Sequence, residues 1–217
     1  MQKKTTSFVL LLMLFLTSGL IIKAEDQGWI NNEIKFNVNE KWDLAFSNEG
    51  RFNEITYQNP YLKNWQAGVL YSLPKNFYLG LRYKRETSDE VLFVLSENRV
   101  TLETGWKKRL GERLNFDLRF RTEIRDFEKE LSDDHLRFRF RVRLTTSLKI
   151  GNLHLKPFIA TEPFGDTLSD EIFRNRFYLG TSFVLSEKVD LIINYIRQDT
   201  KDKETVHILN TGFDIEI

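Results

Sequence analysis

The sequence of 217 residues contains no cysteine and only three histidines. Without cysteine the chain can form no disulfide and no thiolate metal site, and it cannot carry the lipid anchor of a lipoprotein. No histidine stands at metal-ligand spacing from an acidic residue, and there is no glycine-rich phosphate loop. The composition therefore predicts a protein without a metal or another cofactor.

Neither sign of charge is in excess. The chain has 32 Lys and Arg against 31 Asp and Glu. Nucleic-acid-binding domains are usually strongly basic, so this balance argues against nucleic acid as a partner.

Long apolar runs are absent beyond the first 24 residues. The start reads MQKKTTS, then FVLLLMLFLTSGLII, then Lys23-Ala24. A basic segment, a short apolar segment and a small residue indicate a cleaved secretory signal peptide at residues 1–24. The alternative is a membrane anchor, for which the apolar run is short. Cleavage would remove three lysines and leave one domain, residues 25–217, with a net charge of about −2.

What the rest of the chain does have is alternation. In LRFRFRVRLTTSL, residues 136–148, every second residue from Leu136 to Leu144 is apolar, and four arginines occupy the positions between. Strict alternation is typical of a β-strand with two unlike faces. The pattern recurs at residues 34–38, 42–47, 65–73, 77–84, 99–106, 114–125, 153–162, 174–183, 189–195 and 209–217. We expect eleven strands of about 10–13 residues, enough to cross a bilayer at a tilt, whereas strands of soluble domains average about half that length.

The expected connections alternate in length. Short turns are predicted at residues 39–41, 74–76, 151–152 and 186–188, with a somewhat longer one at 107–113. Longer polar loops are predicted at residues 53–61, 85–96, 126–134, 163–171 and 199–205. Short turns at one rim and long loops at the other are typical of outer-membrane barrels.

Two folds could use such strands. In a soluble sandwich the apolar face points into a core, and in a transmembrane barrel it points to lipid. The apolar face runs the whole length of nearly every strand, which favours the barrel, since closure also removes exposed sheet edges. We therefore predict an all-β fold: a single transmembrane antiparallel up-and-down barrel of 10–12 strands, with short periplasmic turns and longer extracellular loops. A secreted soluble β-domain is the alternative.

The strand count is ambiguous. Single-chain bacterial barrels have an even number of strands, so eleven segments imply ten or twelve. Residues 30–38 would be a partial strand in the first case, and one strand would be missing from the list in the second. Trp29 also departs from the apolar alternation of its segment.

Aromatic residues are expected near strand ends on the apolar face, where they would form an interfacial girdle. They are Trp42, Trp65, Tyr71, Phe77, Tyr83, Trp106 and Tyr195. Ordinary strand propensity is the competing interpretation.

Short motifs follow one another along the chain. They are Glu49-x-Arg51, Gly80-x-x-Tyr83, Glu97-Asn98-Arg99, Arg119-x-Arg121-x-Glu123-x-Arg125, Arg137-Phe138-Arg139, Glu162-Pro163-Phe164, Arg174-x-Arg176 and His207. Through them the chain resembles the domain-of-unknown-function 2490 family of bacterial outer-membrane β-barrels. The resemblance covers most of residues 25–217. It implies the outer membrane of a Gram-negative bacterium, with the lipid bilayer and the barrel-assembly machinery as partners, and implies little about activity.

The polar face predicts a charged lumen. Its candidate solute-contacting residues are Glu49, Arg51, Arg82, Arg99, Glu103, Arg119, Arg121, Glu123, Arg125, Arg137, Arg139, Arg141, Arg143, Glu162, Arg174 and Arg176. Bases outnumber acids in this set by more than two to one. One interpretation is a small channel for anionic solutes, since guanidinium groups bind carboxylate and phosphate. The other is a closed structural or interaction barrel, plugged by paired charges.

An enzyme is the third hypothesis. Outer-membrane lipid hydrolases use a serine and a histidine. His135, His154 and His207 occur in no catalytic motif, and His207 shares the apolar parity of Leu209. The sequence therefore predicts no enzyme, and a membrane-embedded lipid hydrolase is the weaker alternative.

Overall fold

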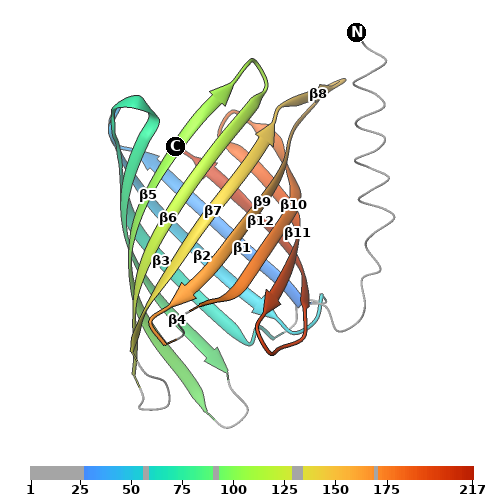
Figure 1. Ribbon diagram of the computed structural model, residues 1–217. Coiled ribbons are helices and arrows are strands. Elements are labelled where there is room, and N and C mark those ends of the chain that lie inside the picture. Colours follow the sequence, from blue (N-terminus) through green and yellow to red (C-terminus); the bar gives the residue numbers. More distant parts are fainter. Residues whose placement is uncertain (1–26, 56–58, 90–92, 129–133, 169–170) are drawn as a thin grey trace.

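The computed structural model describes residues 27–55, 59–89, 93–128, 134–168 and 171–217. The predicted signal peptide, residues 1–24, lies outside these ranges. The described strands form one sheet that closes into a barrel (Figure 1). They are β1 (Gln27–Asn37), β2 (Trp42–Phe52), β3 (Leu62–Ser72), β4 (Phe77–Asp89), β5 (Val94–Leu110), β6 (Leu114–Phe127), β7 (His135–Thr146), β8 (Leu148–Ile150), β9 (Leu153–Asp166), β10 (Ile172–Ser186), β11 (Val189–Thr200) and β12 (Val206–Glu216).

Eleven long strands make up the barrel wall, and the three-residue β8 follows β7 along the same neighbour, β9. Every neighbouring pair is antiparallel except β1 and β12, which run parallel from Gln27 beside Ile208 to Lys35 beside Glu216. The predicted antiparallel barrel is thus confirmed, but the even strand count is wrong. One parallel pair lets an odd number of strands close, and β1 is a full strand.

The parallel seam depends on a glycine. A Cβ atom at Gly212 would lie 1.7 Å from the carbonyl oxygen of Asn31 on β1. Next to it, the backbone N–H of Phe213 donates a hydrogen bond to Oδ1 of Asn32 at 3.0 Å. The two strands therefore approach this closely only because residue 212 has no side chain.

A Gly212→Ala variant should destabilise the barrel, because the added methyl group would force β1 and β12 apart. Overpacking of this kind costs about 1–3 kcal/mol. Urea unfolding of the refolded barrel would measure the loss. The control is Gly165→Ala on β9, where the new Cβ would lie 3.7 Å from the backbone oxygen of Glu171. Equal stabilities of the two variants would contradict a tight seam.

The connections define two rims (Figure 1). The short-turn rim has the turns at residues 38–41, 73–76, 111–113, 151–152 and 187–188. Gly111 and Gly151 adopt positive φ there, as tight hairpins require. The long-loop rim has the remaining connections. Two loops, 85–96 and 163–171, are shorter in the structure than the sequence predicted. Asp89 still pairs with Val94, and β9 continues to Asp166. Both strand ends extend past the apolar belt, where alternation of apolar and polar residues stops.

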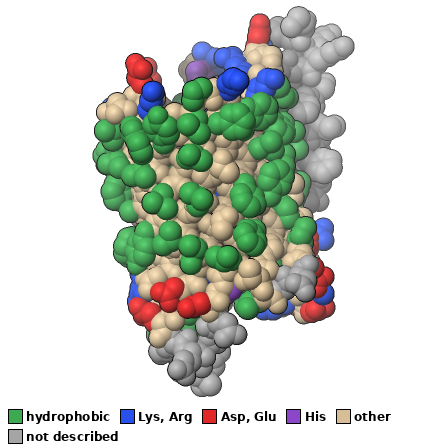
Figure 2. All heavy atoms as spheres, turned by 60° about the vertical axis from the view of Figure 1, so that its left-hand side comes forward, with side chains coloured by type: hydrophobic (Ala, Val, Ile, Leu, Met, Phe, Trp, Pro, Cys, Tyr) green, Lys and Arg blue, Asp and Glu red, His purple; other side chains and the backbone are tan. Residues whose placement is uncertain are grey.

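The burial of side chains is the reverse of that in a soluble protein. Leu102 and Ile124 on the outer face are 59% and 54% exposed, whereas Glu103, Glu123 and Glu162 inside are 2%, 2% and 1% exposed. Figure 2 shows the apolar side chains as a broad belt, with charged side chains above and below it. The predicted faces are therefore confirmed, and the sandwich alternative is wrong because the sheet closes on itself. No helix of the described ranges is long and apolar enough to cross a membrane.

Aromatic side chains cluster on this outer face. Near the short-turn rim Trp42 packs on Tyr71, with ring centroids 4.6 Å apart. Towards the long-loop rim Trp65 packs on Tyr83 at 5.5 Å. Pairs in these positions fit the predicted girdle.

Candidate functional site

The barrel encloses a cavity of about 1230 Å³. Lys75 and Asn76 line it at the short-turn rim, and His135 and Phe173 line it at the long-loop rim. All sixteen charged residues that the sequence predicted for the lumen line this cavity. Their placement follows from strand parity, while contact with a solute remains a prediction.

Basic residues outnumber acidic ones around the cavity. Among its lining residues 18 are Lys or Arg and 10 are Asp or Glu. The lumen residues predicted from the sequence did not include several of these acids, among them Glu33 and Glu86. Glu33 precedes the first clearly alternating segment, and Glu86 lies in a region predicted as loop. Extending strand parity by a few residues would have found both, and the excess of positive charge persists with them included.

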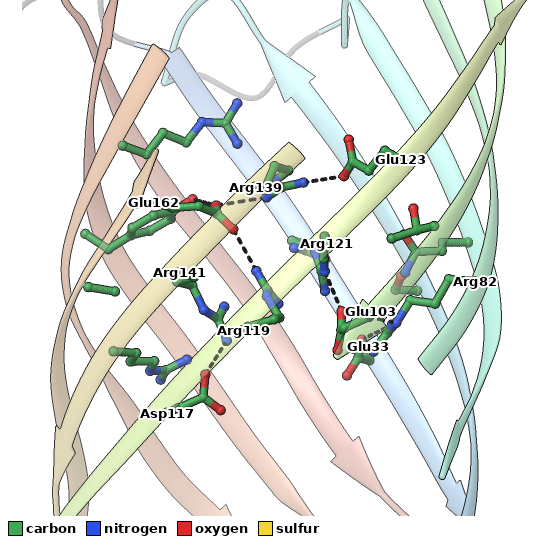
Figure 3. Close-up of a pocket in the computed structure, with 18 of the residues that line it drawn as sticks. Glu33, Arg82, Glu103, Asp117, Arg119, Arg121, Glu123, Arg139, Arg141 and Glu162 are labelled. Carbon is green, nitrogen blue, oxygen red and sulfur yellow. Dashed lines mark hydrogen bonds and ion pairs between the residues drawn. The ribbon is translucent and has the colours of Figure 1, made fainter. Parts of the chain in front are cut away.

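One branched ion-pair network occupies the middle of the lumen, centred on Glu162 of β9 (Figure 3). Glu162 accepts hydrogen bonds from Nη2 of Arg119 at 3.0 Å, Nη2 of Arg139 at 2.8 Å and the hydroxyl of Tyr178 at 2.7 Å. Nη1 of Arg139 also donates to Glu123 on β6 at 2.9 Å. Arg139 therefore joins two buried carboxylates.

The network continues towards the long-loop rim. Glu123 accepts from Nε of Arg137 at 2.6 Å and lies 3.9 Å from Nη1 of Arg99. Nε of Arg99 in turn donates to Glu97 at 2.6 Å, and Nε of Arg125 donates to the same carboxylate at 2.8 Å. Each buried carboxylate here serves at least two guanidinium groups, which offsets the cost of removing these charges from water.

Further ion pairs link β1, β4, β5 and β6 inside the lumen. Nη1 of Arg82 on β4 reaches Glu33 on β1 at 2.9 Å (Figure 3). Glu103 lies between Arg121, to which it is hydrogen-bonded, and Nε of Arg82 at 3.9 Å. Of these pairs, Arg82 with Glu33 joins strands that are not neighbours in the sheet, whereas the contacts of Glu103 join adjacent strands.

A second class of arginine has no carboxylate partner within 4.0 Å in the described part of the chain. Arg143 is the example near the short-turn rim. Its Nε donates to Oγ1 of Thr145 at 3.2 Å, and its guanidinium carbon lies 3.8 Å from the ring centroid of Phe158. A hydroxyl and an aromatic ring orient this group without neutralising it.

Arg174 and Arg176 belong to the same class at the long-loop rim. Nε of Arg174 donates to Thr200 at 3.2 Å, and Nε of Arg176 donates to Gln198 at 2.7 Å. The guanidinium carbons of both also lie over the ring of Phe164, at 5.9 Å and 4.9 Å. No carboxylate of the described residues therefore lies within 4.0 Å of either guanidinium group.

Trp29 departs from the apolar alternation of its segment because its side chain points into the lumen. It is 4% exposed and points inward, where it packs with Ile196 and Ile208. The guanidinium carbons of Arg51 and Arg176 lie 4.1 Å and 4.8 Å from its ring. A cation–π contact of this kind is favourable and leaves the charge in place. Trp29 therefore belongs to the charged lumen and not to the outer belt.

The family model described as "Protein of unknown function (DUF2490)" matches residues 26–208. The chain belongs to the DUF2490 family. The resemblance found in the motifs is thus confirmed. Among solved structures, the β-domain of the Bordetella autotransporter Brka gives a TM-score of 0.46 at 13% identity, covering 79% of this chain and 80% of that chain. No curated protein matches the sequence.

The histidines of this DUF2490 member lie far from one another in the sheet. Nε2 of His135 is 3.1 Å from Nη1 of Arg125 in the lumen. His207 lies on the outer face, where its Nδ1 is 2.5 Å from the hydroxyl of Tyr195. His154 stands opposite Lys149 at the short-turn rim. The hydroxyl group beside His207 is therefore that of a tyrosine. No group of three or more metal-binding side chains is found within the described ranges.

At the long-loop rim, ion pairs connect the strand ends and loops. Arg85 pairs with Glu128, and Lys201 pairs with Glu171. The hydrogen bond from Arg85 lowers the pKa of the Glu128 carboxyl. These pairs are largely exposed, so each contributes little to stability.

Proposed function

We propose that this chain is an outer-membrane β-barrel of a Gram-negative bacterium whose lumen passes small anionic solutes. The observation that carries the proposal is the cavity that is lined from one rim to the other, with 18 basic against 10 acidic residues. A lining of this kind lowers the energy of an anion in the lumen and raises that of a cation.

The outer face supports the membrane location. Residues such as Leu81, Leu102 and Phe140 are 52%, 59% and 42% exposed, which would be unfavourable in water over so wide a belt. Lipid would cover them, and the closed sheet leaves no unpaired backbone edge in the bilayer. Under this proposal residues 1–24 direct export and are cleaved, and the long loops face the exterior.

The arginines favour a particular chemistry of solute. A guanidinium group presents parallel N–H donors that match the two oxygens of a carboxylate or phosphate. The ion pairs across the middle, such as Arg82 with Glu33, restrict the space to small solutes or require these side chains to move aside.

Single-channel recording of the refolded protein in a planar bilayer, under a salt gradient, tests the proposal. We expect discrete conductance and a reversal potential that indicates anion selectivity. Folding would be verified separately by heat-modifiable gel mobility. A silent bilayer from a folded barrel would contradict the pore.

Reversing one uncompensated charge should change the selectivity. In Arg143→Glu an acid replaces a guanidinium that has no carboxylate partner among the described residues, so the reversal potential should move towards that of a cation-selective pore. Arg197→Glu is the matched control, since Arg197 lies on the outer face and its side chain is 55% exposed. A shift of equal size in both variants would show that the effect does not arise in the lumen.

A closed structural or interaction barrel is the second candidate. The observation that favours it is the set of ion pairs between non-neighbouring strands, Arg82 with Glu33 and Arg119 with Glu162. If the folded barrel does not conduct, these pairs act as a plug, and function would lie in the loops of the long-loop rim.

A further inference from the structure

We propose that Arg174 and Arg176 on β10 form a binding site for a small oxyanion, a carboxylate or a phosphate, at the long-loop end of the lumen. The inference rests on the proposed function only in requiring that solution reaches this part of the lumen. It does not require that a solute passes through.

Both arginines have N–H donors that no described residue uses. Each of the two guanidinium groups makes its protein hydrogen bond through Nε, to Thr200 and to Gln198. No described residue accepts a hydrogen bond from their terminal Nη nitrogens. An oxyanion can accept from such nitrogens in pairs, and charge-assisted bonds of this kind are stronger than neutral ones.

The carboxylate that faces Arg176 across the strand pair is engaged by other side chains. Glu162 is directly opposite Arg176 in the register of β9 and β10. Its oxygens are already engaged by Arg119, Arg139 and Tyr178. The carboxylate opposite Arg176 is therefore already hydrogen-bonded to three other side chains, and no carboxylate of the described residues lies within 4.0 Å of the Arg176 guanidinium group.

Aromatic rings hold the two arginine side chains in position. Phe164 lies under both guanidinium groups, and Trp29 of β1 lies against Arg176. Aromatic rings fix the direction of a guanidinium through cation–π contact and contribute no negative charge. The site is thus oriented in advance and retains its full positive charge.

The spacing indicates the class of ligand. Arg174 and Arg176 are two residues apart on one face of a strand, which places their backbones about 7 Å apart. One phosphate bound between flexible side chains, or a short dicarboxylate with one group on each arginine, would satisfy both. A cation or a neutral solute would gain nothing from the site.

Trp29 supplies a direct readout, because its ring contacts Arg176 and faces the lumen. The other three tryptophans, Trp42, Trp65 and Trp106, lie on the outer face and can be replaced by phenylalanine. The emission of Trp29 in the refolded barrel would be followed during titration with inorganic phosphate and, separately, with succinate, at constant ionic strength in potassium chloride. We expect a saturable change with at least one of them, and the effective probe identifies the class of oxyanion.

Two variants make the test specific. Gln198→Glu keeps the packing of Arg176 but places a carboxylate on its Nε, and Arg174→Gln removes the second guanidinium. Each should weaken binding by about tenfold or more, whereas Arg197→Gln on the outer face should leave the affinity unchanged. No saturable change with either probe, or equal affinities in all variants, would overturn the site. Conductance tests the pore independently of the binding site. A barrel that binds phosphate but does not conduct would support the binding site and contradict the pore. A barrel that conducts but shows no change in Trp29 emission would support the pore and contradict the binding site.

Discussion

A Phe140→Arg variant is expected to fail to assemble in a membrane. Phe140 lies near the middle of β7, points outward and is 42% exposed. It stands opposite Phe120 of β6 on the same outer face. In the proposed orientation an arginine here would face lipid at mid-depth, which costs about 2–4 kcal/mol in a transmembrane barrel. The measurement is the folded fraction in lipid vesicles, read from heat-modifiable gel mobility.

The same charge placed on the other face of β7 is the control. Thr145 lines the cavity, so Thr145→Arg adds an identical side chain on the lumen side. That variant should assemble, and Phe140→Leu should assemble as well because it stays apolar. If Thr145→Arg blocked assembly and Phe140→Arg did not, the apolar belt would not be the lipid-facing surface.

Replacing Glu162 by glutamine should produce the largest loss of stability among lumen variants. Glu162 is 1% exposed and accepts hydrogen bonds from two arginines and one tyrosine. Without its charge, Arg119 loses its carboxylate partner and Arg139 retains only Glu123. Breaking a buried ion pair on one side costs about 3–5 kcal/mol. Urea unfolding of the barrel in vesicles would measure the change in unfolding free energy.

The matched control is Glu171→Gln at the long-loop rim. Glu171 also pairs with a base, Lys201, but both side chains are about half exposed. Exposed pairs contribute about 0–1 kcal/mol, so this variant should unfold almost like the unmodified protein. Similar losses in the two variants would mean that water screens the lumen network as it screens the rim.

Most of the fold could be predicted from the sequence, because alternation is a local property. Arg137 to Arg143 alternate with apolar residues, and the period alone places all four on one face. The length of the apolar rows then indicated which face points outward. The same parity placed every predicted lumen residue around the cavity.

The closure of the sheet could not be predicted in this way. Periodicity within β1 and β12 does not reveal whether they pair in parallel, since side chains alternate in either direction. The clue was Gly212, whose role depends on Asn31, a residue 181 positions away in the chain. The inward position of Trp29 could not be predicted for a similar reason. It depends on Ile196 and Ile208, which are distant in the sequence but provide an apolar surface for its ring inside the lumen.

The sequence also could not predict which arginines have a carboxylate partner and which have none within the described residues. Arg139 and Arg176 look alike in their strands, yet one has two carboxylate partners and the other has a tryptophan and an amide. Which base meets which acid depends on the shear of the barrel, and therefore on pairing across several strands. Composition could predict a positive lumen but not the positions of its uncompensated charges.

The odd number of strands has a topological consequence. Gln27 begins β1 at the long-loop rim, and Ile217 pairs with Lys35 and Asn37 at the short-turn rim. In a barrel with an even number of strands the two ends meet at one rim, and a short peptide can join them in a circular permutant. Here a joining peptide would have to cross the height of the wall, about 25 Å for tilted strands of this length. If the barrel spans a membrane as proposed, reporter tags inserted before Gln27 and after Ile217 would lie on opposite sides, so a single protein molecule would label both faces of the bilayer.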